Sequence, residues 1–268
     1  MTEPEPLTSR QQAIVPIAAF AAEGNLAKLN TALEQGLDAG LTINDTKEIL
    51  VQVYAYAGFP RSLNALGTLM SVVETRKARG VTDEIGKLPS HPLPKGDALL
   101  STGTANQTQL AGGVVQGPLF DFAPAIDEFL KTHLFGDIFS RDNLSWHDRE
   151  IATLAMLAVL PGAEPQLQAH IAIAMNLGLT PEQLTSVITG LKQLVNQASA
   201  ERAQTALNQH LEHQPTTKSN TSMNNLDTAK SPSETLDNGR RELLKMTGAG
   251  IAMTIATTIP TPALASLN

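Results

Sequence analysis

Gly178-Leu-Thr-Pro-Glu-Gln183 marks a sharp corner between two apolar segments that have the spacing of α-helices. Glycine accepts the positive φ that ends many helices, so Gly178 is expected just beyond a helix C-terminus. Thr180 is followed by Pro181 and, three residues on, by Gln183, which is the pattern of a helix N-cap with a capping box. The stretch therefore predicts a tight corner between two helices, and with it a helical fold.

The same corner occurs earlier in the chain as Gly40-Leu-Thr42, and its surroundings repeat with it. At the same shift in residue number, the apolar positions 29, 33 and 37 coincide with 167, 171 and 175, and the stripe from 49 to 57 coincides with that from 187 to 195. Both stripes have the i, i+1, i+4, i+7, i+8 spacing of an amphipathic helix. We predict an all-α protein built by tandem duplication of one helical unit.

Composition excludes several classes of function. The chain has 268 residues and no cysteine, which excludes disulfides, thiolate metal sites and dithiol redox chemistry. Its formal net charge is -7, whereas nucleic-acid binding usually requires an excess of basic residues. No nucleic-acid partner is therefore expected. Aromatic residues make up only 4% of the chain, a balance that favours helices packed through small aliphatic side chains.

Changes in composition divide the chain into parts. A first unit is expected at residues 1–80 and a second at 118–213, separated by a connector at 81–117 that is rich in proline, glycine, serine and threonine. A phenylalanine-rich run at 120–139 is expected to pack against a substantial surface. Residues 214–238 have no aromatic side chain and are expected to form a disordered linker.

The last part, residues 239–268, has the order of a twin-arginine export signal. Arg240-Arg241 precedes an uncharged, weakly apolar stretch and small residues at 263–266. Because such a signal acts at an N-terminus, we interpret the tail as the signal of another protein joined by fusion or read-through, and we expect a cytoplasmic protein. The alternative is a membrane anchor, which the glycines and prolines of the stretch disfavour. A membrane partner is expected only if the tail acts in that way.

A few polar side chains stand among the apolar helical positions and are the candidates for chemistry. They are Tyr56, Arg61 and Asn64 in the first unit, and Arg149, Glu150, Gln166 and His170 in the second. Gln166 and His170 lie one turn apart on one helix face, and His170 leans toward the apolar stripe. Structural roles stay open at this point, because a core histidine, a buried tyrosine and a surface ion pair have the same pattern. No two histidines have ligand spacing within one structured helix, so no metal site is expected.

These motifs resemble the carboxymuconolactone decarboxylase family over about residues 7 to 80 and 118 to 212. The matching segments are Asp148-Arg149-Glu150, Gln166-Leu-Gln-Ala-His170, the two Gly-Leu-Thr corners, and Tyr56-Ala-Gly-Phe-Pro-Arg61 with Asn64-Ala65. The resemblance implies the all-helical alkyl hydroperoxidase D-like fold and a homo-oligomer. The peroxidase branch of that fold needs a Cys-x-x-Cys pair, so its activity is excluded for this cysteine-free chain.

Each copy of the unit keeps only part of the family's polar residues. Ala32 stands where the second copy has His170, and Leu194 stands where the first has Tyr56. We therefore predict one composite site to which both units contribute, with His170 close to Tyr56.

The resemblance also implies an activity, the decarboxylation of a small carboxylated lactone by a carboxy-lyase without a cofactor. By chemical type, Arg149 or Arg61 would bind a carboxylate. Tyr56 or Asn64 would donate to the developing enolate oxygen, and His170 would protonate carbon. The predicted catalytic residues are His170, Arg149 and Glu150, and the predicted substrate-binding residues are Tyr56, Arg61, Asn64 and Gln166. Two alternatives remain: a non-catalytic oligomeric or ligand-binding member of the fold, and an enzyme for another small carboxylated or lactone substrate.

Overall fold

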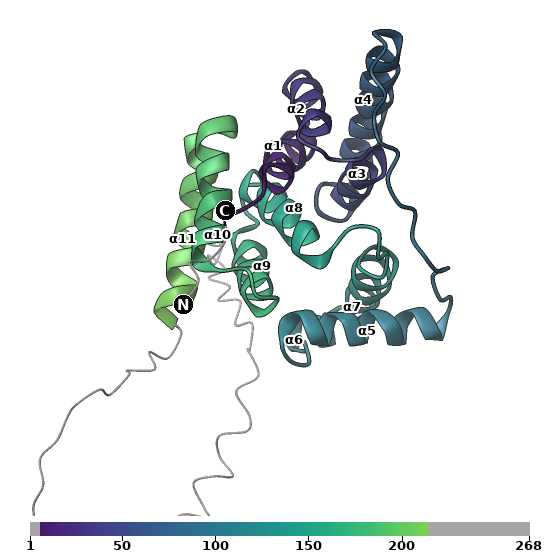
Figure 1. Ribbon diagram of the computed structural model, residues 1–268. Helices are drawn as coiled ribbons and strands as arrows, with labels where there is room; N and C mark the ends of the chain where they lie inside the picture. Colours follow the sequence, from purple (N-terminus) through teal and green to yellow (C-terminus); the bar gives the residue numbers. More distant parts are fainter. Residues whose placement is uncertain (1–5, 214–268) are drawn as a thin grey trace, which may run out of the picture.

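The computed structural model describes residues 6–213, which form an all-helical molecule (Figure 1). Across these residues there are eleven α-helices, two π-helical segments and no β-strand. The all-α prediction is confirmed. The expected linker at 214–238 and the twin-arginine-like tail at 239–268 lie outside the described residues.

The helices follow one another with short connections, apart from the segment that precedes α5. In the first half they are α1 (Ser9–Glu23), α2 (Leu26–Asp38), α3 (Ile43–Ala57), α4 (Phe59–Ala78) and α5 (Asp97–Ala111). In the second half they are α6 (Pro118–Phe122), α7 (Pro124–Phe129), the π-helix η1 (Leu130–Ile138), α8 (Trp146–Ala158), α9 (Glu164–Asn176), α10 (Pro181–Gly190), the π-helix η2 (Leu191–Val195) and α11 (Gln197–His213).

The two Gly-Leu-Thr corners form as expected. Gly40 follows α2 with a φ of 93°, and Gly178 follows α9 with a φ of 102°. Residues that have a Cβ rarely adopt this backbone conformation. Thr42 and Thr180 then N-cap the next helices. The corner between the second and third helix of each unit is thus confirmed in both places.

Both corners carry a full capping box, although the sequence pattern predicted one only at Thr180. The backbone N–H of Gln183 donates to the Thr180 hydroxyl (3.2 Å), and Thr180 N–H donates to the Gln183 side chain (3.0 Å). At Thr42 the same two bonds, each 3.0 Å, involve Asp45. A carboxylate takes the place of the amide there because it accepts the same backbone N–H and also favours the positive end of the helix.

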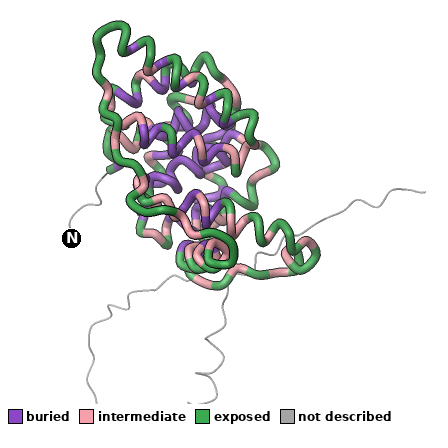
Figure 2. The backbone as a smooth tube through the Cα atoms, turned by 90° about the vertical axis from the view of Figure 1, so that its right-hand side faces the viewer, coloured by how far each residue is buried: buried purple, intermediate pink, exposed green. Residues whose placement is uncertain are grey.

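The main hydrophobic core draws residues from both predicted units. Helices α1 and α8 lie against each other at its centre (Figure 1), and the buried backbone concentrates in the middle of the molecule (Figure 2). From Ile14 to Ala22, α1 is buried around its whole circumference, as is typical of a helix surrounded by protein. Fully buried alanines such as Ala18 and Ala155 leave the core helices room to pack closely.

Residues 81–117, which composition indicated as a connector, contain helix α5. It packs tightly on η1, because a Cβ at Gly103 would lie only 1.8 Å from the backbone oxygen of Lys131. Threonine hydroxyls on α5 bond to carbonyl oxygens one turn back, as Thr104 does to Leu100 (2.8 Å), so these polar residues are compatible with a helix. The predicted connector therefore contains a packed helix.

A second apolar cluster forms around this contact. Its buried members are Leu110, Leu134, Phe135, Ile138, Phe139 and Ile173. The phenylalanine-rich run packs as expected at Phe135 and Phe139, whereas Phe122 and Phe129 are exposed. The cluster brings α5 and η1 against α9, the helix that carries His170.

Candidate active site

His170 lies between a carboxylate and a phenol. It is on α9, with its side chain 8% exposed, and its Nδ1 is 2.9 Å from Oε2 of the completely buried Glu150 on α8. Its Nε2 is 3.4 Å from the hydroxyl of Tyr56 on α3, and the two rings meet edge to face. The structure thus brings together His170 and Tyr56, one from each predicted unit.

The hydrogen bonds around Tyr56 run in one direction. Gln52 Nε2 donates to the Thr153 hydroxyl (2.7 Å), and that hydroxyl donates to the Tyr56 oxygen (3.2 Å). Burial, together with the negative charge of Glu150, raises the pKa of Tyr56 well above its ordinary value, so the phenol keeps its proton. The acceptor left for that proton is Nε2 of His170, which places the histidine's own proton on Nδ1, facing Glu150.

Arg149 is occupied by the protein itself. It is fully buried and donates to Glu48 Oε2 (3.0 Å), the Arg141 backbone oxygen (2.9 Å) and Gln52 Oε1 (3.3 Å). Burial lowers the pKa of Arg149, and the bond to Glu48 opposes this change. The expectation that Arg149 binds a substrate carboxylate does not fit this placement, because a buried guanidinium needs an internal counterion.

Three other predicted residues lie away from this cluster, on the surface. Helix α4 buries Ser62, Ala65 and Leu69, so Arg61 and Asn64 lie off its buried face and are exposed. Arg61 packs on Gly24, at the end of α1. The structure does not bring these two side chains to His170, because α4 leaves the site after the positive φ of Gly58.

Gln166 is exposed as well, in the first turn of α9. It lies one turn before His170 on the same helix face, as the i, i+4 spacing predicts. Its position is compatible with contact to a ligand that approaches His170 from outside.

Glu48, Gln52 and Arg141 belong to the polar cluster and were missed at the level of sequence. Arg141 forms a two-pronged pair with Glu48, with Nε to Oε2 at 2.9 Å and Nη2 to Oε1 at 2.7 Å. A signal existed on α3, because Glu48, Gln52 and Tyr56 follow each other at four-residue spacing and share one helix face. Arg141 sits in the turn before α8, where no periodicity marks a residue.

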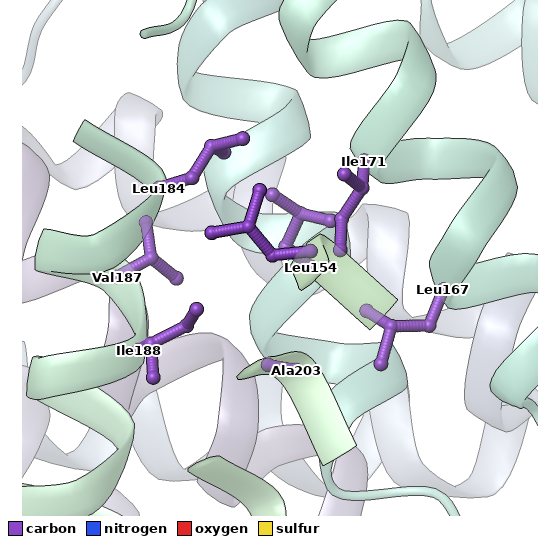
Figure 3. Close-up of a pocket in the computed structure, with 8 residues that line it drawn as sticks. Leu154, Leu167, Ile171, Leu184, Val187, Ile188 and Ala203 are labelled. Atoms are coloured by element: carbon purple, nitrogen blue, oxygen red, sulfur yellow. The ribbon is translucent and has the colours of Figure 1, made fainter. Parts of the chain in front are cut away.

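An enclosed cavity elsewhere offers no substrate site. It lies among α8, α9, α10 and α11, and its side chains, among them Leu154, Ile171 and Val187, point toward one another (Figure 3). Its volume of about 10 Å³ is at the limit for one water molecule, and its lining is wholly aliphatic. The cavity is therefore a packing gap.

Within residues 6–213 no helix combines the length and apolar character needed to cross a bilayer. The same part of the chain holds no group of three or more His, Asp or Glu side chains arranged to bind a metal ion.

Fold and site together define an all-helical protein with a buried histidine held between a carboxylate and a phenol, an arrangement suited to proton transfer. Residues 124–209 match the model of the carboxymuconolactone decarboxylase family. The matched part includes Glu150 and His170, whereas Tyr56 lies outside it. The resemblance expected from the motifs is confirmed for this part of the chain.

A curated relative agrees with this match. It is the 4-carboxymuconolactone decarboxylase of Acinetobacter baylyi, 33% identical over 70 residues. The aligned part is 26% of this chain and 52% of the relative, so the chain spans about half the length of the curated relative it matches.

Proposed function

We propose that this protein is a carboxy-lyase that removes CO₂ from a small carboxylated lactone or a related organic acid, without a cofactor. The observation that carries the proposal is the buried His170, held by Glu150 on one side and facing Tyr56 on the other. The family match at 124–209 and the partial likeness to a decarboxylase support the same reaction class.

The chemistry requires an acid that protonates carbon and a hydrogen-bond donor to the oxyanion that forms. When CO₂ leaves, the electrons of the broken carbon–carbon bond pass to the conjugated carbonyl oxygen, and the resulting enolate is then protonated at carbon. Tyr56, kept neutral by burial, donates a hydrogen bond to that oxygen in place of His170 Nε2. Nε2, freed in this way, takes up a proton from solvent and delivers it to carbon, so His170 ends in the form in which it began. Glu150 orients the ring through its contact with Nδ1.

The substrate enters this scheme between Tyr56 and His170. The distance of 3.4 Å between the Tyr56 hydroxyl and His170 Nε2 is long for a hydrogen bond. This contact is replaced when a substrate carbonyl oxygen accepts the hydrogen bond from the tyrosine. The positive charge of Arg149, close to Tyr56, favours the negative charge that develops on the substrate oxygen. Gln166 is the candidate for direct contact with the substrate's polar groups.

The test is turnover of a panel of carboxylated lactones, followed by CO₂ release. His170→Ala is expected to lower the rate by roughly 10²- to 10⁴-fold, the usual worth of a general acid, with the helical circular dichroism unchanged. His133→Ala is the matched control, because His133 is an exposed surface histidine paired with Asp137. Equal rates for His170→Ala and the wild type would remove His170 from the mechanism.

A non-catalytic ligand-binding protein is the second candidate. It is favoured by the occupation of Arg149 within the protein and by the surface positions of Arg61 and Asn64, which leave the expected carboxylate-binding set incomplete. Calorimetric binding of a panel member without CO₂ release would select this candidate over the lyase.

We also propose that the chain forms a homo-oligomer. Phe59, Leu63 and Met70 are each more than 60% exposed and share one face of α4, and exposed apolar side chains gathered on one face are typical of protein–protein contacts. Leu63→Glu is expected to lower the mass measured by light scattering, whereas Leu88→Glu, at an exposed site outside any helix, is not. A wild-type protein with the mass of a single chain contradicts the proposal.

A further inference from the structure

A cleft of about 390 Å³ opens where α5, the turn after η1 and the start of α8 meet. Its walls combine the apolar side chains of Phe139, Leu144 and Trp146 with polar ones, among them Arg141 and Asp142. A hollow of this volume, in which an aromatic side chain lies beside charged and hydrogen-bonding groups, can hold a small molecule. His170 does not line this cleft, and neither the proposed reaction nor the family match assigns it a role.

Arg141 brings a fixed and partly unused cation to the cleft. Its side chain is 32% exposed, and Nε and Nη2 are held by Glu48. A guanidinium has five N–H groups, and within residues 6–213 no acceptor is bonded to Nη1. Because Glu48 already holds the guanidinium in place, an incoming anion meets a donor that needs little further ordering.

The charges of the three groups bonded to one another at Arg141 do not cancel, and Asp137 and Asp142 are the carboxylates nearby. Glu48 is shared between Arg141 and the fully buried Arg149, so these three bonded groups carry one net positive charge. One carboxylate placed on Arg141 would bring that charge to zero. Arg–carboxylate pairing through two parallel hydrogen bonds is the strong form of such a contact.

Asp142 restricts the anion to a single charge. Hydrogen bonds from the Ser90 hydroxyl and backbone lower the pKa of Asp142, so a second negative charge lines the same cleft. A dianion such as phosphate would be repelled there, whereas a monocarboxylate with an apolar body matches both the cation and the apolar walls.

We propose that this cleft binds a small aromatic or unsaturated monocarboxylate, with its carboxylate on Arg141 and its apolar body against Trp146.

Trp146 makes the test direct, because it is the only tryptophan of the chain and lines the cleft. Titration of the full-length protein with benzoate is expected to give a saturable change in Trp146 fluorescence. Benzamide, which has the same shape without the charge, and inorganic phosphate are expected to give none. Arg141→Gln is expected to weaken benzoate binding by about 10- to 100-fold, the worth of a charged hydrogen bond. Arg79→Gln, at an exposed ion pair with Glu34, is the matched control and is expected to bind as the wild type does.

A second variant keeps the test decisive if Arg141→Gln fails to fold. Thr102 lines the cleft from α5, so Thr102→Phe fills it while leaving the Arg141–Glu48 pair in place, and is expected to abolish the benzoate response. His170→Ala is expected to retain it, which separates this site from the proposed lyase chemistry. The proposal is overturned if wild-type fluorescence does not saturate, if benzamide or phosphate acts as benzoate does, or if folded Thr102→Phe still responds.

Discussion

At the residue scale, Glu48 bonds directly to Arg141 and Arg149, the two arginines of the polar cluster. It is 5% exposed and receives hydrogen bonds from Arg149 (3.0 Å) and from Arg141. Removing one partner from a buried ion pair leaves a desolvated charge behind, which costs more than the pair itself contributes. The stability of the site therefore depends on this side chain more strongly than on any surface ion pair.

Glu48→Gln is expected to lower the free energy of unfolding by about 3 kcal/mol, because Arg149 would remain buried without a counterion. Denaturant titration followed by circular dichroism measures this loss. Arg79→Gln removes the exposed pair with Glu34 and is expected to change stability by less than about 1 kcal/mol. Equal effects of the two substitutions would contradict the role given to Glu48.

The hydrogen bonds to Glu48 also predict that the stability of the protein depends on pH. Burial opposes ionisation of Glu48, but the hydrogen bonds from Arg141 and Arg149 outweigh it and hold the pKa of Glu48 below its ordinary value of 4.5. As pH falls below that value, the unfolded chain takes up a proton before the folded protein does, so stability is lost as pH falls through the folded-state pKa. The stability gap between the wild type and Glu48→Gln should therefore narrow in acid and be constant near neutral pH.

At the element scale, the contact between α5 and η1 depends on a missing side chain. Gly103 faces the backbone of η1, and Gly136 of η1 in turn lies against Leu99. Neither position has room for a Cβ without movement of the neighbouring group. Glycine therefore lets the two helices approach closely and places Phe135 and Phe139 in the cluster beside α9.

Gly103→Ala is expected to displace α5, lower the free energy of unfolding by about 2 kcal/mol and speed hydrogen exchange in α5. Gly67→Ala is the matched control, because Gly67 lies inside α4 with open space around its Cβ position. That change should stabilise the protein by about 0.5–1 kcal/mol through helix propensity. Unchanged exchange in α5 of Gly103→Ala would contradict the close contact.

At the scale of the whole molecule, the two predicted units are joined by a shared core and by shared polar groups. Helix α1 packs on α8, and Gln52 donates to Thr153 and to the Arg149 backbone oxygen across the same boundary. Each unit alone would expose much of the surface that the other covers. The molecule is therefore expected to unfold as one cooperative body.

Thermal unfolding should give a single transition, coincident for far-UV circular dichroism and for Trp146 fluorescence. Gln52→Ala, which cuts the polar contacts between the units, is expected to shift both signals to lower temperature together. Two separated transitions, or a shift in one signal only, would show that the units unfold independently.

The sequence was sufficient wherever one short stretch contains the whole physical cause. The Gly-Leu-Thr corners form because a glycine and a capping threonine stand two positions apart in the chain, and the amphipathic stripes define helices in the same local way. Helix α5 shows the limit, because its stability rests on the contact with η1 and its composition resembles a connector.

For the candidate site, residue types and helix spacing singled out His170 and Tyr56, and the resemblance to the family added Glu150 and predicted that His170 would lie close to Tyr56. Only the tertiary structure decided where each arginine lies. Arg149 is buried and bonded to Glu48, Arg61 lies on the surface, and Arg141 faces a cleft. The reason is that helix periodicity depends on neighbours three or four residues away, whereas a buried charge depends on whichever counterion the fold brings to it from a distant part of the chain.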